Sequence, residues 1–228
     1  MTMKKNLKHT LRALALLLSY PDARVRELLP AFAAAIDDEA ALPAQRRAEI
    51  RALAQEMVLA DPIAVEARYV ELFDRGRSTS LHLFEHVHGD SRDRGPAMVD
   101  LVKHYEAAGL FFDGKELPDH LCVVLEFAST QPPAQAREFL GEMAHILQAL
   151  FTALRQRESA YASLVAGVLE LAGQKAEAVP ITPDEALDAS WEEPQAFGGC
   201  STQGQAAPGQ PQPIQIVRRP GAAQGART

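Results

Sequence analysis

Apolar residues recur every three or four positions along most of the chain, which is the spacing of one face of an α-helix. Leu7, Leu11, Leu14 and Leu18 illustrate the pattern in the first segment. Cap and turn residues interrupt it where helices would begin or end. The expected boundaries are an end near Ser19, starts at Pro21, Pro43 and Pro62, a helix over 96–108, an end near Ser129, a long helix from Pro133 through Leu154, and a last helix carrying Leu164 to Leu171. The pattern predicts an all-α fold, a single helical bundle of about eight or more helices.

The helical pattern stops before the last quarter of the chain. Residues 198–228 are rich in Gly, Pro and Gln, which are too polar to offset the entropy lost on ordering. One short stretch, 214–217, has the alternation of a strand. We therefore expect a helical domain over 1–174 and a mostly flexible tail over 175–228.

The net charge of −7 hides an asymmetry between the two parts of the 228-residue chain. Residues 198–228 contain three arginines and no acidic residue, so the preceding residues carry 30 acidic side chains against 20 Lys and Arg. An acidic body disfavours binding to a phosphate backbone and suits a basic peptide. We expect no nucleic-acid partner.

The N-terminus imitates a signal peptide without completing one. Its apolar run is short and follows Arg12, and Tyr20-Pro21-Asp22 stands where a small-residue cleavage site would be. No run is long enough to cross a membrane. Cys122 and Cys200 have no paired spacing, which indicates a reducing compartment. We expect a cytoplasmic protein that meets a membrane only indirectly, through a partner.

The segment Glu116-Leu117-Pro118-Asp119-His120 precedes an apolar helix. Proline is favoured in the first turn, so Pro118 is predicted to open the helix, with Asp119 and His120 in that turn. The helix dipole there favours a carboxylate and disfavours imidazolium. Such a pair suits a catalytic dyad, a cap or a recognition point for a cation. No nucleophile can be assigned to it, since Cys122 would lie about 200° around the helix from His120.

A second motif, His82-Leu83-Phe84-Glu85-His86, matches the His-x-x-Glu-His pattern of inverted zinc peptidases. On a helix, His82 and His86 would share the face that two zinc ligands need, with Glu85 as the base and His88 or Asp90 as a further ligand. Gly89 follows closely and leaves only a short helix. A structural or partner-facing cluster is therefore favoured over a metal site.

Other cofactor and catalytic motifs are incomplete. Residues 109–116 nearly match a phosphate-binding loop, but Glu116 replaces its hydroxyl residue, and Phe111 and Phe112 suit core packing better. No Gly-x-Ser-x-Gly or Cys-x-x-Cys motif is present. We expect no cofactor and no enzymatic activity.

Taken together, these segments resemble the nitrate reductase delta-subunit family, the NarJ-type assembly chaperones, which belong with the all-helical chaperones of molybdoenzymes. The likeness covers roughly residues 7–173. The segments that carry it are Leu17 to Pro21, Tyr69 to Asp74, Ser80 to Pro96, Glu116 to Leu121 and Leu125 to Phe127. The family signature Tyr-x-x-Leu-Phe falls on Tyr69, Leu72 and Phe73, and the signature Glu-x-x-Asp-His falls on Glu116, Asp119 and His120.

The resemblance implies a cytoplasmic chaperone without catalytic activity. It would bind the N-terminal segment of the apo catalytic (alpha) subunit of a respiratory nitrate reductase. It would hold that subunit open for insertion of the molybdenum cofactor and delay its docking to the membrane anchor.

The residues themselves offer a recognition surface for such a peptide. Tyr69, Leu72 and Phe73 have the spacing i, i+3, i+4 and share one helix face, which suits either the apolar floor of a groove or ordinary core. The expected partner-binding residues are Tyr69, Leu72, Phe73, Glu116, Pro118, Asp119 and His120. We expect Asp119→Ala to weaken peptide binding with helicity intact, and His120 to make the affinity depend on pH near neutrality.

Two other functions remain open from sequence. One is a zinc-dependent hydrolase that uses His82, Glu85 and His86. The other is a helical adaptor that binds a different partner through residues 198–228.

Overall fold

A computed structural model describes residues 6–89, 91–112 and 114–181 of the chain. Within these residues it contains ten α-helices, one short 3₁₀-helix and no strand. The predicted all-α fold is therefore confirmed. The predicted strand at 214–217 and most of the predicted tail lie outside the described residues.

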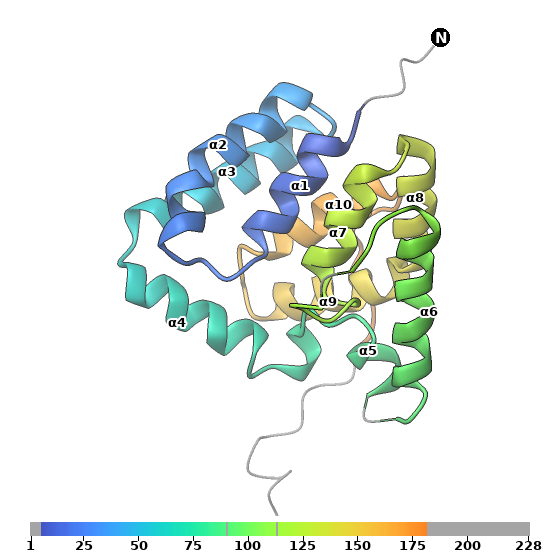
Figure 1. Cartoon of the computed structure of the whole chain (residues 1–228). Coiled ribbons are helices and arrows are strands. Elements are labelled where there is room, and N and C mark those ends of the chain that lie inside the picture. Colours follow the sequence, from blue (N-terminus) through green and yellow to red (C-terminus); the bar gives the residue numbers. More distant parts are fainter. Residues whose placement is uncertain (1–5, 90, 113, 182–228) are drawn as a thin grey trace, which may run out of the picture. The chain divides into compact units, whose positions relative to one another are not determined.

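The helices follow one another through connections that are short except before α5 and α7 (Figure 1). Their bounds are α1 Lys8–Leu17, α2 Ala23–Glu39, α3 Ala44–Leu59, α4 Pro62–Phe73, α5 Glu85–His88, α6 Arg94–Ala107, α7 Leu121–Thr130, α8 Pro133–Glu142, α9 Ala144–Gln156 and α10 Ala162–Leu171, with the 3₁₀-helix η1 at Arg77–Thr79. In the part of the chain that is described, none of them is long and apolar enough to span a bilayer.

Helix caps explain why the early boundaries could be located from sequence. The Asp22 carboxylate accepts a hydrogen bond from the backbone N–H of Val25 at the start of α2. Asp61 does the same for Ala64, and Pro62 occupies the first position of α4, as predicted. Gly109 ends the turn after α6 with φ of +80°, a conformation that favours glycine.

The apolar core lies around α1 and α10. Helix α1 packs against α2 and α7, while α10 packs against α9, α3 and α8 (Figure 1). Nine of the ten residues of α10 are buried. Gly167 keeps this helix close to its neighbours, because a Cβ at this position would lie 3.3 Å from Leu42 Cδ1. The core fixes the scaffold on which the candidate site is built.

One expected helix is in fact two. The segment from Pro133 to Leu154 was predicted as a single long helix, and this prediction is wrong, because α8 ends at Glu142 and α9 begins at Ala144. Met143 has φ −93° and ψ 4°, and its N–H donates a hydrogen bond to Leu140 O, three residues back, in place of the i−4 bond of an α-helix. Gly141 weakens the helix beside this break. The apolar positions keep their spacing across the bend, so periodicity could not reveal it.

Candidate partner-binding site

The predicted start of the site helix is wrong by three residues. Helix α7 begins at Leu121, and His120 is its N-cap, with Nδ1 accepting from Cys122 N–H at 3.4 Å. Pro118 lies before the helix, and its carbonyl oxygen accepts a hydrogen bond from the buried Tyr105 hydroxyl at 2.8 Å. Asp119 and His120 are therefore outside the first turn, and the helix dipole is not what holds Asp119.

Pairing with a distant segment replaces the expected helical turn. Leu121 N–H donates to Leu81 O at 2.8 Å, and Leu83 N–H donates to Asp119 O at 3.1 Å. His82 and His120 thus form an isolated antiparallel bridge, with ring centroids 5.0 Å apart. The extended backbone at His120, with φ −65° and ψ 129°, is required by this pairing and excludes a helix there.

Asp119 is a fully buried junction between three segments. Its Oδ2 accepts from Phe84 N–H at 3.0 Å. Oδ1 lies 3.6 Å from His82 Nδ1, and Oδ2 lies 3.7 Å from Arg94 Nη2 at the start of α6. Arg94 also pairs with Glu85 at 3.1 Å. The carboxylate joins the start of α7 to the 82–84 segment and to α6.

The pKa values of Asp119, His82 and His120 are all shifted by their shared surroundings. Burial opposes the charge of Asp119, but His82, the Phe84 N–H and Arg94 outweigh it, so the pKa of Asp119 is lowered. The Asp119 carboxylate raises the pKa of His82 despite partial burial. Burial, reinforced by His82, lowers the pKa of His120. The site therefore favours an ionised Asp119 and a neutral His120.

We predict that the two imidazoles titrate in a fixed order when followed by NMR, with His82 above and His120 below the usual value of about 6.5. Stabilisation by His82 is present below about pH 6.5 and disappears as pH rises through its raised pKa. His120 acts oppositely, because the folded state resists its protonation as pH falls below about 6.5. Asp119→Asn should lower the midpoint of His82. The reverse order of midpoints would contradict this geometry.

The helical zinc arrangement is not formed. Helix α5 begins at Glu85, so His82 and His86 do not share a helix face. His86 Nε2 lies 2.9 Å from Ser80 O, while Glu85 accepts from the Ser80 hydroxyl at 2.5 Å. His88 lies against the Phe84 ring. Across the residues described, no three His, Cys, Asp or Glu side chains group closely enough to hold a metal ion.

Tyr69, Leu72 and Phe73 do share one face of α4, and that face points into the core. Each of the three is no more than 8% exposed. The Tyr69 hydroxyl donates to Leu18 O at 2.9 Å, and the Phe73 ring packs edge-on against Tyr161 with centroids 5.1 Å apart. A partner cannot lie on this face in the conformation described. Their partner-binding role stays a prediction.

The surface beside Glu116 holds a pocket that sequence did not indicate. Its volume is about 450 Å³, and it lies between the 110–116 loop and α7. Phe111, expected to pack in the core, is 89% exposed on its rim, and Leu117 is 44% exposed nearby. The lining residues are Tyr105, Leu110, Phe111, Phe112, Lys115, Glu116, Val123, Glu126, Phe127 and Thr130. It combines aromatic rings with two carboxylates.

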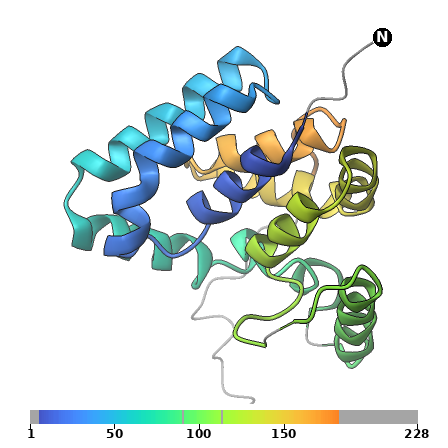
Figure 2. The same cartoon turned by 45° about the horizontal axis from the view of Figure 1, so that its top comes forward.

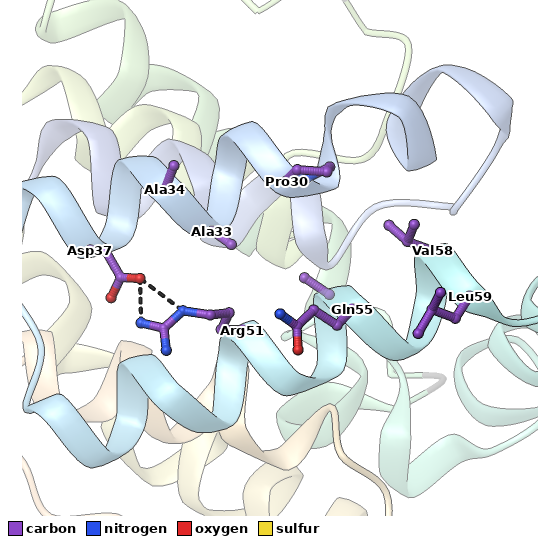
Figure 3. Close-up of a pocket in the computed structure, with 9 residues that line it drawn as sticks. Pro30, Ala33, Ala34, Asp37, Arg51, Gln55, Val58 and Leu59 are labelled. Carbon is purple, nitrogen blue, oxygen red and sulfur yellow. Dashed lines mark hydrogen bonds and ion pairs between the residues drawn. The ribbon is translucent and has the colours of Figure 1, made fainter.

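A second apolar hollow of about 570 Å³ lies between α2 and α3 (Figure 3). Pro30, the small side chains of Ala33, Ala34 and Ala54, and the apolar Val58 and Leu59 line most of it. At one end Arg51 Nε donates to Asp37 Oδ2 at 2.9 Å. The alanines that line this hollow are visible in the sequence, but nothing in the sequence shows that α2 and α3 face each other.

Comparison with known proteins points to one family. A model described as "Nitrate reductase delta subunit" matches residues 22–166. The chain is 43% identical over 203 residues to the nitrate reductase molybdenum cofactor assembly chaperone NarJ of Escherichia coli (strain K12), covering 81% of this chain and 84% of the relative. It is 40% identical over 195 residues to the probable assembly chaperone NarW of the same strain, covering 81% of both. A probable NarJ of Bacillus subtilis (strain 168) is 32% identical over 156 residues, covering 68% of this chain and 84% of the relative.

Proposed function

Because this chain belongs to the nitrate reductase delta-subunit family, we propose that it is a cytoplasmic assembly chaperone for a respiratory nitrate reductase. It binds the N-terminal segment of the apo catalytic (alpha) subunit. It thereby keeps that subunit open for insertion of the molybdenum cofactor and delays docking to the membrane anchor. The observation that carries the proposal is the 43% identity to a named assembly chaperone over 81% of the chain.

The chemistry of the site supports a role without catalysis. The Asp119 carboxylate is fully buried and committed to Phe84, His82 and Arg94, so it is not presented to a substrate. Burial raises the pKa of the Cys122 thiol, which keeps it protonated and unreactive. The residues around the start of α7 are therefore suited to holding a surface in place rather than to bond cleavage.

The surface held in this way suits a basic, amphipathic peptide. Glu116 and Leu117 are exposed, directly before the anchored Pro118 and Asp119. Phe111 adds an exposed ring at the neighbouring pocket. Apolar side chains flanked by carboxylates are what a peptide helix with basic flanks requires. Within this proposal Asp119 is a positioning residue, and Glu116, Leu117 and Phe111 touch the peptide.

Titration calorimetry with the full chain tests this function. We expect binding of a synthetic peptide with the sequence of the N-terminal segment of the catalytic subunit, and weaker binding as salt concentration rises. A peptide of the same composition in scrambled order is the control. Equal heats for the two peptides would contradict the proposal.

A further inference from the structure

Helix α6 packs closely against none of the other helices of the described fold. Of its fourteen residues, only Leu101 and Tyr105 are buried. It lies at the edge of the fold (Figure 2), and its His104 and Tyr105 rings contact Phe139 of α8 and Phe127 of α7. By contrast, α10 buries nine of its ten residues. Elements with little buried apolar surface are those that open locally at low cost.

Both ends of α6 are tied to the segment that precedes α7. At the first residue, Arg94 pairs with Asp119 at 3.7 Å and with Glu85 at 3.1 Å. Near the last turn, the Tyr105 hydroxyl donates to Pro118 O at 2.8 Å. Two adjacent residues, Pro118 and Asp119, thus receive a polar contact from each end of the same helix. We refer to these contacts of Arg94 and Tyr105 as the latch.

The latch holds α6 over an aromatic surface. Tyr105 lies against Phe127 of α7 with ring centroids 4.5 Å apart. His104 stacks on Phe139 of α8 at 5.3 Å, and Phe127 and Phe139 contact each other at 4.9 Å. Phe127 and Phe139 are now only 6% and 7% exposed. Removal of α6 would take both covering rings away from them.

Hollows and carboxylates surround the covered rings. Phe127 lines the pocket beside Glu116 and also a second pocket of about 500 Å³ next to Phe139. Exposed glutamates border the two pockets, namely Glu116, Glu126, Glu138 and Glu142. One lysine, Lys115, also lines the pocket beside Glu116. The surface is apolar at its centre and mainly acidic at its edge.

We propose that α6 is a displaceable cover, and that the α7–α8 face beneath it accepts an amphipathic, basic helix in its place. The occupant follows from the surface: aromatic rings call for apolar side chains on one helix face, and the bordering glutamates call for Lys or Arg beside them. A helix already fills this position from within the chain. The inference rests on the proposed function and identifies the client's N-terminal segment as the replacement for α6.

Hydrogen exchange of the full chain, with and without the synthetic client peptide, tests the displacement. We expect amides of 94–107 to exchange faster in the complex, and amides of α7 to exchange more slowly. Binding with unchanged exchange in 94–107 overturns the cover and leaves the proposed function standing. Absence of binding by the unmodified chain contradicts the proposed function itself, and the cover with it.

A variant that lacks one hydroxyl group tests the latch and leaves Asp119 unchanged. Tyr105→Phe keeps the ring on Phe127 and removes only the hydrogen bond to Pro118 O. A lost buried hydrogen bond should raise the population of the open form, and hence the association rate of the peptide, about fivefold. Tyr161→Phe is the matched control, a buried tyrosine whose hydroxyl contacts only the Met57 sulfur at 3.8 Å among the hydrogen bonds of the described residues. Equal association rates for Tyr105→Phe and the control overturn the latch.

Discussion

Replacing Asp119 with alanine should lower the free energy of unfolding by about 3 kcal/mol, because it removes one partner from a buried charged pair. The carboxylate is fully buried, and its loss leaves the Phe84 N–H without its acceptor and Arg94 without one of its two ion-pair partners, Glu85 being the other. The start of α7 would also lose its tie to α6. Peptide binding should weaken, because Glu116 and Leu117 would no longer be held in place, and we expect this loss to outweigh the easier release of α6 at its Arg94 end.

Urea unfolding followed by circular dichroism measures this loss. Asp119→Asn should recover part of the stability, because its amide oxygen can still accept from Phe84 N–H. Asp100→Asn is the control, an exposed carboxylate paired with Lys103, and should change the stability by no more than about 0.5 kcal/mol. Helicity below the unfolding transition should be retained, as the sequence led us to expect. An Asp119→Ala protein as stable as its parent would show that the buried junction is not a stabilising feature.

Phe73→Ala should lower the free energy of unfolding by about 3–5 kcal/mol, the range for truncating a buried phenylalanine. The ring is 5% exposed and packs between Tyr69, at 4.8 Å, and Tyr161, at 5.1 Å between centroids. The sequence left two roles open for this face of α4, namely groove floor and core. The burial favours the core.

Thermal or urea unfolding of two phenylalanine variants separates the roles. Phe111→Ala is the comparison, because this ring is 89% exposed and its loss should alter stability by no more than about 0.5 kcal/mol. We expect Phe111→Ala to weaken peptide binding and Phe73→Ala to weaken folding. A small stability change for Phe73→Ala together with lost peptide binding would show that Phe73 acts in peptide binding and not in the core.

Local signals explain most of what could be predicted of the fold. The Asp22 and Asp61 carboxylates each accept a hydrogen bond from a backbone N–H three residues further along the chain. Because this contact is local, the position of each aspartate in the sequence is enough to locate the start of α2 and of α4. The break at Met143 has no such signal, because the apolar spacing is the same on both sides of it. Periodicity reports which face is buried, and it is insensitive to a bend that keeps the same face buried.

The candidate site shows where local reasoning fails. The sequence singled out Asp119 and His120, but their conformation is set by pairing with Leu81 and Leu83, far away along the chain. Pro118 suited a first turn by propensity, yet that distant pairing overrides the preference. Phe111 was assigned to the core by its apolarity alone, and its exposure depends on the path of a loop.

The hollow between α2 and α3 is an alternative to the α7 surface as the place where a peptide binds. It is apolar, but apart from Asp37, which is paired with Arg51 and Arg47, it has no carboxylate in its lining. A basic segment should therefore favour the α7 surface. Exchange protection confined to α2 and α3 on peptide binding would instead place the site there.

If this chain recognises the N-terminal segment of the apo catalytic subunit, the immobilised full chain should capture that subunit only when the segment is present. We predict capture of the intact apo subunit, loss of capture on truncation, and competition by the synthetic segment. Equal capture of the intact and truncated subunits would contradict the claim.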